Sequence, residues 1–249
     1  MKISFSGVWD ETVRLLRTNA SLFFAIAGVF LFLPTLVSGY FAPEPTGGGE
    51  AATLAAFLAH VRENWLLLLV VNLIGFVGNL ALLILALDEG RPTVGRAIGA
   101  AFILLPFYFF ASFFSGIIIG IGIMALIVPG LYLMGRLAPM GPVIVAENRR
   151  SPFDVIRRTF AVTKGHGWAI LGLIMIVVLT FWIVSIAATA VFGSIFLLLD
   201  RSAGTGGLGA MLLLLLQAAI VAAFNTVLMV LLASLYRRLV PREPGINGI

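Results

Sequence analysis

Long apolar runs alternate with short polar segments along almost the whole chain. The runs Leu66–Leu87, Phe102–Pro129 and Gly207–Leu235 each exceed the roughly 18 apolar residues that indicate a membrane-spanning helix. Polar breaks divide the pattern into six predicted spans: about Ala20–Tyr40, Trp65–Leu87, Phe102–Ile127 and Leu131–Ala146, and stretches within Trp168–Leu198 and Leu208–Tyr236. The sequence therefore predicts an all-α, polytopic membrane bundle of six transmembrane helices.

Shorter segments with apolar residues on one side only are predicted to lie on the membrane surface. Phe5–Thr18 has Val8 and Leu15 on one side and charged residues on the other, which is the pattern of an amphipathic interfacial helix. Ala51–Glu63 is predicted to form a second short surface helix before the second span.

The most charged of these segments is Ser151–Lys164. Ser151 is a favourable helix N-cap, and a proline follows it at the first helical position. Phe153, Ile156 and Phe160 recur at i, i+3 and i+7, so this helix is predicted to turn these three side chains toward the core.

Two local patterns bear on how the spans connect. Val128–Gly130, with the sequence VPG, is predicted to reverse the chain between the third and fourth spans. Glu89–Ile98 resembles Glu147–Ile156 in the spacing of an acid, an arginine, a hydroxyl residue and an isoleucine. If the N-terminal helix is a third copy, the chain consists of three units, each a surface helix followed by two spans.

Composition supports the membrane assignment and limits the chemistry. The chain is 61% hydrophobic and only 11% charged, whereas soluble domains carry roughly 25% charged residues. It has no cysteine, and its two histidines, His60 and His166, fall on opposite sides of the six-span arrangement. No motif for nucleotide binding, metal binding or nucleophilic catalysis is present. We therefore expect residues 1–249 to form a single integral membrane domain without a soluble catalytic domain, enzymatic activity, cofactor or metal.

The basic residues are distributed very unevenly between the two sides. In the six-span arrangement, Arg62 and Arg201 are on one side and Arg136 is within a span. Basic loops stay in the cytoplasm, so both termini are predicted to be cytoplasmic. Because the basic residues border apolar spans, they indicate phospholipid headgroups rather than nucleic acid as partners. The other thirteen basic residues share the second side: Lys2, Arg14, Arg17, Arg91, Arg96, Arg149, Arg150, Arg157, Arg158, Lys164, Arg237, Arg238 and Arg242.

Two groups of residues are candidates for function. The first is the cationic set around Ser151–Lys164, which could bind anionic lipid or a membrane partner, or could only fix topology: Arg136, Arg149, Arg150, Arg157, Arg158 and Lys164. Arg136 stands out because an unpaired charge inside a membrane costs at least about 2.5–3.5 kcal/mol. Its guanidinium could contact a lipid phosphate, a substrate anion or an acid, or it could bond carbonyls freed by Pro139 and Pro142.

The second group is polar and uncharged. Asn72 and Asn79 are seven residues apart on one helix face, and Gln217 and Asn225 could join the same polar bundle interior. In membranes such residues usually form hydrogen bonds between packed helices, and a polar pathway is the alternative.

A family resemblance appears in the segment that surrounds the charged helix. Its elements are Pro129–Gly130, Arg136, Pro142, Glu147, Arg157–Arg158, Thr163–Gly165 and Trp168. In this order they resemble the membrane domain of glycerophosphoryl diester phosphodiesterases and related small bacterial inner-membrane proteins of unknown function. The resemblance implies location in the bacterial inner membrane but not hydrolase activity, because the catalytic barrel that follows this domain in the phosphodiesterases is absent from the chain.

These patterns predict a non-enzymatic, multi-pass inner-membrane protein that engages membrane phospholipids, a membrane protein partner or further copies of itself. The alternative is a small transporter or channel with a polar site near Arg136.

Overall fold

The computed structural model describes residues 4–43, 54–88, 90, 93–203 and 207–240, and every regular element in these ranges is a helix. The N-terminal part contains a π-helical segment, η1, in which the helix is locally widened. In chain order the elements are α1 (Phe5–Thr18), α2 (Ala20–Ala27), η1 (Gly28–Phe32), α3 (Leu33–Phe41), α4 (Leu54–Leu87), α5 (Val94–Ala125), α6 (Ile127–Leu137), α7 (Met140–Glu147), α8 (Pro152–Val162), α9 (Gly167–Ala203) and α10 (Leu208–Leu239).

Six helical segments are long and apolar enough to cross a membrane. The first combines α2, η1 and α3, and the fourth combines α6 and α7; α4, α5, α9 and α10 supply the other four. The short amphipathic helices α1 and α8 are not among the six. The predicted fold class, an all-α arrangement with six spans, is therefore confirmed.

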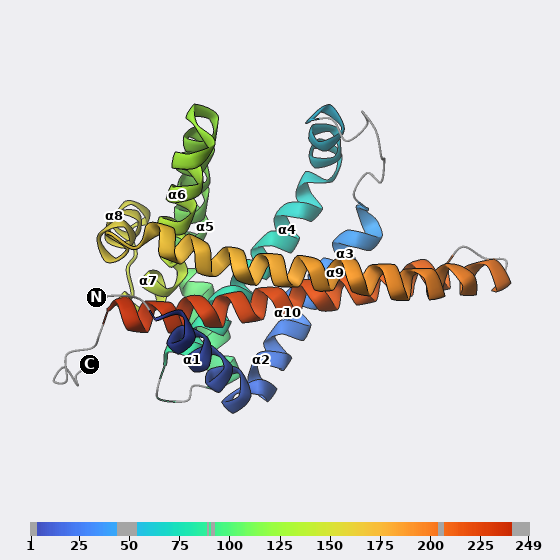
Figure 1. Ribbon diagram of the computed structural model, residues 1–249, viewed down its shortest axis with the longest axis horizontal. Coiled ribbons are helices and arrows are strands. Elements are labelled where there is room, and N and C mark those ends of the chain that lie inside the picture. Colours follow the sequence, from blue (N-terminus) through green and yellow to red (C-terminus); the bar gives the residue numbers. More distant parts are fainter. Residues whose placement is uncertain (1–3, 44–53, 89, 91–92, 204–206, 241–249) are drawn as a thin grey trace.

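The long helices pack as pairs that point in different directions. Figure 1 shows α9 and α10 side by side along most of their length, while α5 and α6 form a second pair that leaves the rest of the molecule at a large angle. The start of α1 and the end of α10 lie close together, where Arg238 contacts Gly7 (Figure 1). A helix of 32 residues, such as α5 or α10, is about 48 Å long, so it can cross the roughly 30 Å of hydrocarbon only when tilted or when its ends project beyond it.

Burial is concentrated toward one end of these helices. In α4 the buried residues lie between Val77 and Leu87, and in α10 the run Met229–Tyr236 is buried throughout. Near the end of α5 and in the middle of α9, the side chains of Met124 and Trp182 are 89% and 62% exposed. The helices are therefore tightly packed at one end, and their apolar surfaces become free to face lipid toward the other.

The reversal between the third and fourth spans lies two residues earlier than predicted. It occurs at Leu126, which is in extended conformation between α5 and α6, so Val128–Gly130 belongs to the first turn and a half of α6. Gly130 is still required, because a Cβ atom there would lie 2.6 Å from the backbone nitrogen of Ile123. The glycine permits the close approach of the two helices instead of making the turn.

The surface helix predicted at Ala51–Glu63 is not a separate element. Residues 51–53 lie outside the described part of the chain, and the remainder forms the first turns of α4, which runs unbroken to Leu87. No proline or glycine separates Glu63 from Trp65, and the Asn64 side chain donates to the carbonyl of His60 at 3.1 Å within the helix.

The three predicted units share one local feature and differ in another. Ser4, Thr93 and Ser151 each cap a helix, with hydroxyl oxygens that accept from the backbone N–H three residues later at 3.3, 3.4 and 3.5 Å. However, α1 and α8 end before the spans that follow them, whereas the helix capped by Thr93 continues directly into the third span.

Candidate functional site

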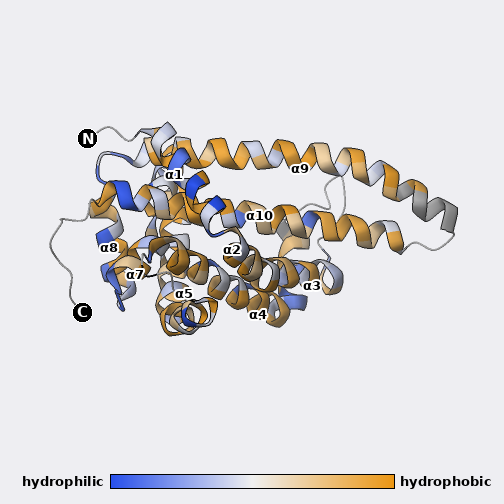
Figure 2. Ribbon diagram, turned by 90° about the horizontal axis from the view of Figure 1, so that it is seen from below, coloured by the Kyte–Doolittle hydropathy of each residue, from blue (hydrophilic) through white to orange (hydrophobic). Residues whose placement is uncertain are grey.

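Most of the thirteen basic residues that the sequence assigns to one side lie in one compact region of the structure. We call this region the basic end. It consists of α1, the end of α4, the end of α7, α8 and the end of α10. Figure 2 shows hydrophilic residues gathered toward this end, near α1 and α8, whereas α9 and α10 are mostly hydrophobic along their length. The basic end is thus where the segments between spans come together.

Two consecutive arginines of α10 fasten α1 and α4 to this end. Arg237 Nη2 donates to the carbonyl of Ala86 in the last turn of α4 at 2.7 Å, and its Nη1 lies 3.4 Å from the carboxylate of Glu11. Arg238 Nη2 donates to the carbonyl of Gly7 at 2.8 Å. A Cβ atom on Gly7 would lie 2.7 Å from the Arg238 guanidinium, so the glycine leaves the space that this contact needs.

Glu147 joins α7, α8 and α10 through three hydrogen bonds. Its carboxylate accepts from Arg149 Nε at 2.6 Å, from Arg158 Nε at 2.8 Å and from the hydroxyl of Tyr236 at 2.9 Å. The chain can turn back toward α8 because Asn148 ends α7 in the left-handed conformation, with φ at 46°. Two predicted lipid ligands, Arg149 and Arg158, therefore share one carboxylate within the protein, which the sequence did not indicate.

Arg136 stabilises the end of α8. Its Nη2 donates to the carbonyl of Phe160 in the last turn of α8, and its Nε donates to the hydroxyl of Thr163 at 3.3 Å. The Thr163 hydroxyl in turn lies 3.1 Å from the carbonyl of Arg136. The guanidinium also lies 4.8 Å from the ring centre of Phe160 and 5.7 Å from that of Tyr132.

This geometry distinguishes among the roles that the sequence left open for Arg136. The residue bonds a carbonyl, as one alternative proposed, but the carbonyl belongs to α8 and is not one freed by Pro139 or Pro142. A cation at the C-terminus of a helix also interacts favourably with the helix dipole. Within the described part of the chain, no carboxylate pairs with Arg136.

The buried face of α8 differs from the predicted one. Val155, Ile156 and Thr159 are the buried residues, whereas Phe160 is half-buried and Phe153 is 67% exposed. The prediction was therefore wrong for Phe153, whose ring stacks on Phe114 of α5 with centroids 5.0 Å apart. Thr159 can face the core because its hydroxyl donates to the carbonyl of Val155 at 2.7 Å.

The remaining predicted cations are available to a partner. Arg157 makes only a long ion pair to Asp154, at 3.4 Å between two largely exposed side chains. The side chains of Arg150 and Lys164 are exposed and have no ion pair or hydrogen bond with the described part of the chain. Arg150 also lines a groove of about 610 Å³ between α4, α5 and α7, whose lining includes Asp88, Asn148 and Ile103.

Three of the four predicted polar residues come together inside the span region. Asn72, Asn79 and Asn225 line one cavity of about 180 Å³ between η1, α3, α4 and α10, where Asn79 and Asn225 are half-buried and Asn72, contrary to the predicted interior position, is exposed. Gln217 is exposed and does not line this cavity, so its assignment to the polar interior was wrong. It precedes Asn225 by eight residues, which places it about 80° away around the axis of α10.

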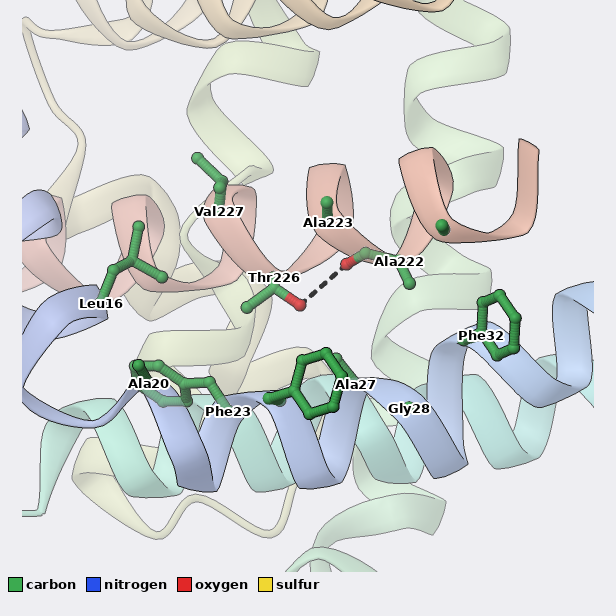
Figure 3. A pocket seen from close by; sticks show the side chains of 12 residues that line it. Leu16, Ala20, Phe23, Ala27, Gly28, Phe32, Ala222, Ala223, Thr226 and Val227 are labelled. Atoms are coloured by element: carbon green, nitrogen blue, oxygen red, sulfur yellow. Dashed lines mark hydrogen bonds between the residues drawn. The ribbon is translucent and has the colours of Figure 1, made fainter. Parts of the chain in front are cut away.

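A larger cavity nearby has the opposite chemistry. It measures about 470 Å³ and lies between α2, η1 and α10, where it is lined almost entirely by apolar side chains such as Phe23, Phe32 and Val227 (Figure 3). Its threonine, Thr226, donates its hydroxyl to the carbonyl of Ala222 at 2.8 Å. This cavity can receive apolar groups but offers nothing to bind a polar ligand.

Electrostatics at the basic end favour ionised carboxylates. The hydrogen bond from Arg14 lowers the pKa of Glu11 below its ordinary value, and the charges of Arg14, Arg237 and Arg238 act in the same direction against the opposing effect of partial burial. Among the described residues, no group of three or more histidines and acids is arranged to hold a metal ion.

Comparisons with known proteins add no assignment. No protein-family model matches the chain. A search of solved structures also found no match. The function must therefore be argued from the geometry of the basic end and of the cavities.

Proposed function

We propose that this integral membrane protein is not an enzyme and that its basic end binds anionic phospholipid. The observation that carries the proposal is the position of Arg150: exposed, without an internal partner in the described part of the chain, and lining the groove between α4, α5 and α7. Ile103 of α5 lines this groove and is 59% exposed. A lipid phosphate at Arg150 would thus have apolar surface nearby for its acyl chains.

The cations fall into two groups, those bonded within the protein and those exposed, and this supports the same conclusion. Arg136, Arg149 and Arg158 are engaged within the protein, whereas Arg150, Arg157 and Lys164 extend toward the surroundings from one stretch of chain. A basic residue near an anionic membrane surface contributes about 1 kcal/mol to binding. We propose that these three supply the electrostatic part of lipid binding.

The same proposal covers orientation and location. The strong basic asymmetry supports cytoplasmic termini in a bacterial inner membrane. The resemblance of the segment Pro129–Trp168 to a phosphodiesterase membrane domain supports the same location. The carboxylates near the groove are poorly suited to catalysis, because Glu147 accepts from three partners and Asp88 accepts from the backbone N–H of Gly90 at 2.8 Å.

The experiment compares lipid binding by charge variants of the purified protein. Native mass spectrometry should show tighter retention of phosphatidylglycerol than of phosphatidylcholine, and Arg150→Gln with Lys164→Gln should reduce the phosphatidylglycerol affinity about fivefold per charge removed. Asp88→Asn, which removes a negative charge from the groove lining, should raise this affinity.

Arg62→Gln is the matched control, because Arg62 is exposed on α4 far in sequence from the basic end and should leave lipid retention unchanged. Equal losses in the control and the double variant would contradict the proposal. Hydrolysis of glycerophosphodiesters or phospholipids by the same preparation would contradict its non-enzymatic part.

The alternatives from the sequence make different predictions in the same preparation. If the free cations bind a membrane protein or a further copy of the chain, light scattering should detect a complex that the double variant loses. A transporter or channel centred on Arg136 is not favoured, because two of its three guanidinium nitrogens donate to Phe160 at the end of α8 and to Thr163 just after it.

A further inference from the structure

The cavity lined by Asn72, Asn79 and Asn225 is the most polar feature within the spans. Asn72 and Asn79 lie in the middle of the apolar part of α4, and Asn225 lies near the middle of α10. Thr35 of α3 also contributes to the lining. Polar groups at this depth are costly unless they are satisfied by one another or by a ligand.

Helix packing does not account for these asparagines. In the packing explanation their amides should bond across helices, but Asn72 Nδ2 donates to the carbonyl of Leu68 at 2.8 Å, and Asn225 Nδ2 donates to that of Val221 at 3.0 Å. The Thr35 hydroxyl likewise donates to the carbonyl of Leu31 at 2.7 Å. Each of these side chains thus donates within its own helix, and each asparagine amide keeps a second N–H.

The cavity contains an unsatisfied oxygen acceptor. The side-chain oxygen of Asn79 is buried and has no hydrogen-bond partner. A buried polar atom left in this state costs about 1–3 kcal/mol, which a suitable donor would recover. The second N–H of the Asn72 and Asn225 amides and the amide group of Asn79 also border the cavity, so the Asn79 oxygen stands out as the acceptor that a bound donor would satisfy.

The backbone around the cavity is arranged to keep it open. Gly75 lines it, and a Cβ atom added there would meet nothing within 4 Å, whereas a Cβ on Gly78, one turn later, would lie 2.7 Å from Phe30. Phe30 and Leu31 of η1 form part of the opposite wall, and π-helical segments of this kind occur frequently at functional sites. Gly78 brings the helices together, and Gly75 leaves the space beside their contact.

We propose that this cavity is an intramembrane binding site for a small neutral group that presents hydroxyl or N–H donors. The lining contains no Asp, Glu, Lys or Arg, so it lacks the counter-charge that an ion needs on leaving water. The site is independent of the lipid-binding proposal, because none of its lining residues belongs to the basic end.

The absence of cysteine from the sequence allows a direct test. Gly75→Cys places a single thiol in the cavity, and its modification by a small neutral methanethiosulfonate reagent can be followed with and without glycerol. Glycerol should slow the modification of Gly75→Cys. Adding Asn79→Leu should weaken the apparent glycerol affinity about fivefold, the equivalent of one hydrogen bond, while leaving the modification rate without glycerol unchanged.

Gly116→Cys is the control, because Gly116 lines an apolar cavity and a Cβ there also meets nothing within 4 Å. Glycerol should not protect it. Repeating the assay with the protein in lipid vesicles that contain dioleoylglycerol, in place of glycerol, shows whether the hydroxyl group can come from a membrane lipid or from water. Protection by either compound supports the site. No modification of Gly75→Cys, no protection by either compound, or protection only by sodium or choline would overturn the proposal.

Discussion

At the scale of single residues, arginine side chains of this protein connect helices through hydrogen bonds. Arg136 and Arg237 each donate to a main-chain carbonyl in the last turn of another helix, at Phe160 and Ala86. The planar guanidinium can reach such a carbonyl while a second N–H group bonds another acceptor. An arginine close to apolar segments is thus stabilised by unpaired carbonyls at helix ends, where the helix dipole is negative.

The role of Arg136 predicts a defined loss of stability. Arg136→Ala removes the bonds to the Phe160 carbonyl and the Thr163 hydroxyl and should destabilise the protein by about 1.5–3 kcal/mol, the range for hydrogen bonds from a charged donor. Thermal unfolding in detergent measures the effect. Arg62→Ala removes an exposed arginine and should leave the melting temperature nearly unchanged. If both variants melt like the wild type, the capping role is wrong.

At the scale of elements, α1 is held to the bundle by a small number of polar contacts and a buried apolar face. Val8, Thr12 and Leu15 are buried, and Glu11 and Gly7 receive the arginines of α10. The pKa of Glu11 is lowered mainly by its hydrogen bond with Arg14 of the same helix, and the charges of Arg237 and Arg238 on α10 add to this effect. Through the α10 arginines, ionised Glu11 stabilises the docked helix. This contribution is complete above the ordinary glutamate pKa and is lost as the pH falls through the lowered value.

Acidification should therefore loosen α1. A spin label on Thr18→Cys, an exposed position at the end of α1, should become more mobile as the pH falls from neutral through and below the ordinary glutamate range. With Glu11→Gln the label should already be more mobile at neutral pH and should lose this pH response. A response that persists in Glu11→Gln would assign the effect to another group.

At the scale of the whole molecule, the packed basic end and the exposed far ends form one consistent arrangement. The tight contacts join segments that connect the spans, and the helix pairs lose mutual contact with distance from this end (Figure 1). Exposed apolar residues such as Met124 and Trp182 would be unfavourable in water, whereas lipid can cover them without cost. The exposed apolar side chains are thus suited to contact with lipid.

This arrangement predicts the accessibility of the two sides. In single-cysteine chains, Arg62→Cys and Arg150→Cys should react with a membrane-impermeant maleimide from opposite faces of the membrane, with Arg150→Cys on the cytoplasmic face. Reporter fusions at the two termini should both give a cytoplasmic signal. Labelling of both cysteines from one face, or a periplasmic signal at either terminus, would contradict the orientation.

The sequence by itself determined the properties that depend on local pattern and on average polarity. Apolar runs of sufficient length dictate helices in a membrane, because each backbone polar group there must be satisfied within its own segment. α1 begins and ends at the predicted residues, and Ser151 caps α8 as predicted, because these signals act within one helical turn. The shared face of Asn72 and Asn79 followed from helical geometry alone.

Only the tertiary structure decided which side chains use one another. Glu147, Arg158 and Tyr236 are far apart in sequence, so no spacing rule indicates that the carboxylate neutralises the arginine and leaves Arg150 free. The exposure of Phe153 depends on how α8 lies against α5, and the position of Gln217 depends on where α10 leaves the bundle. Such features arise from contacts between distant segments, whose partners are set by three-dimensional packing and not by the local hydrophobic period.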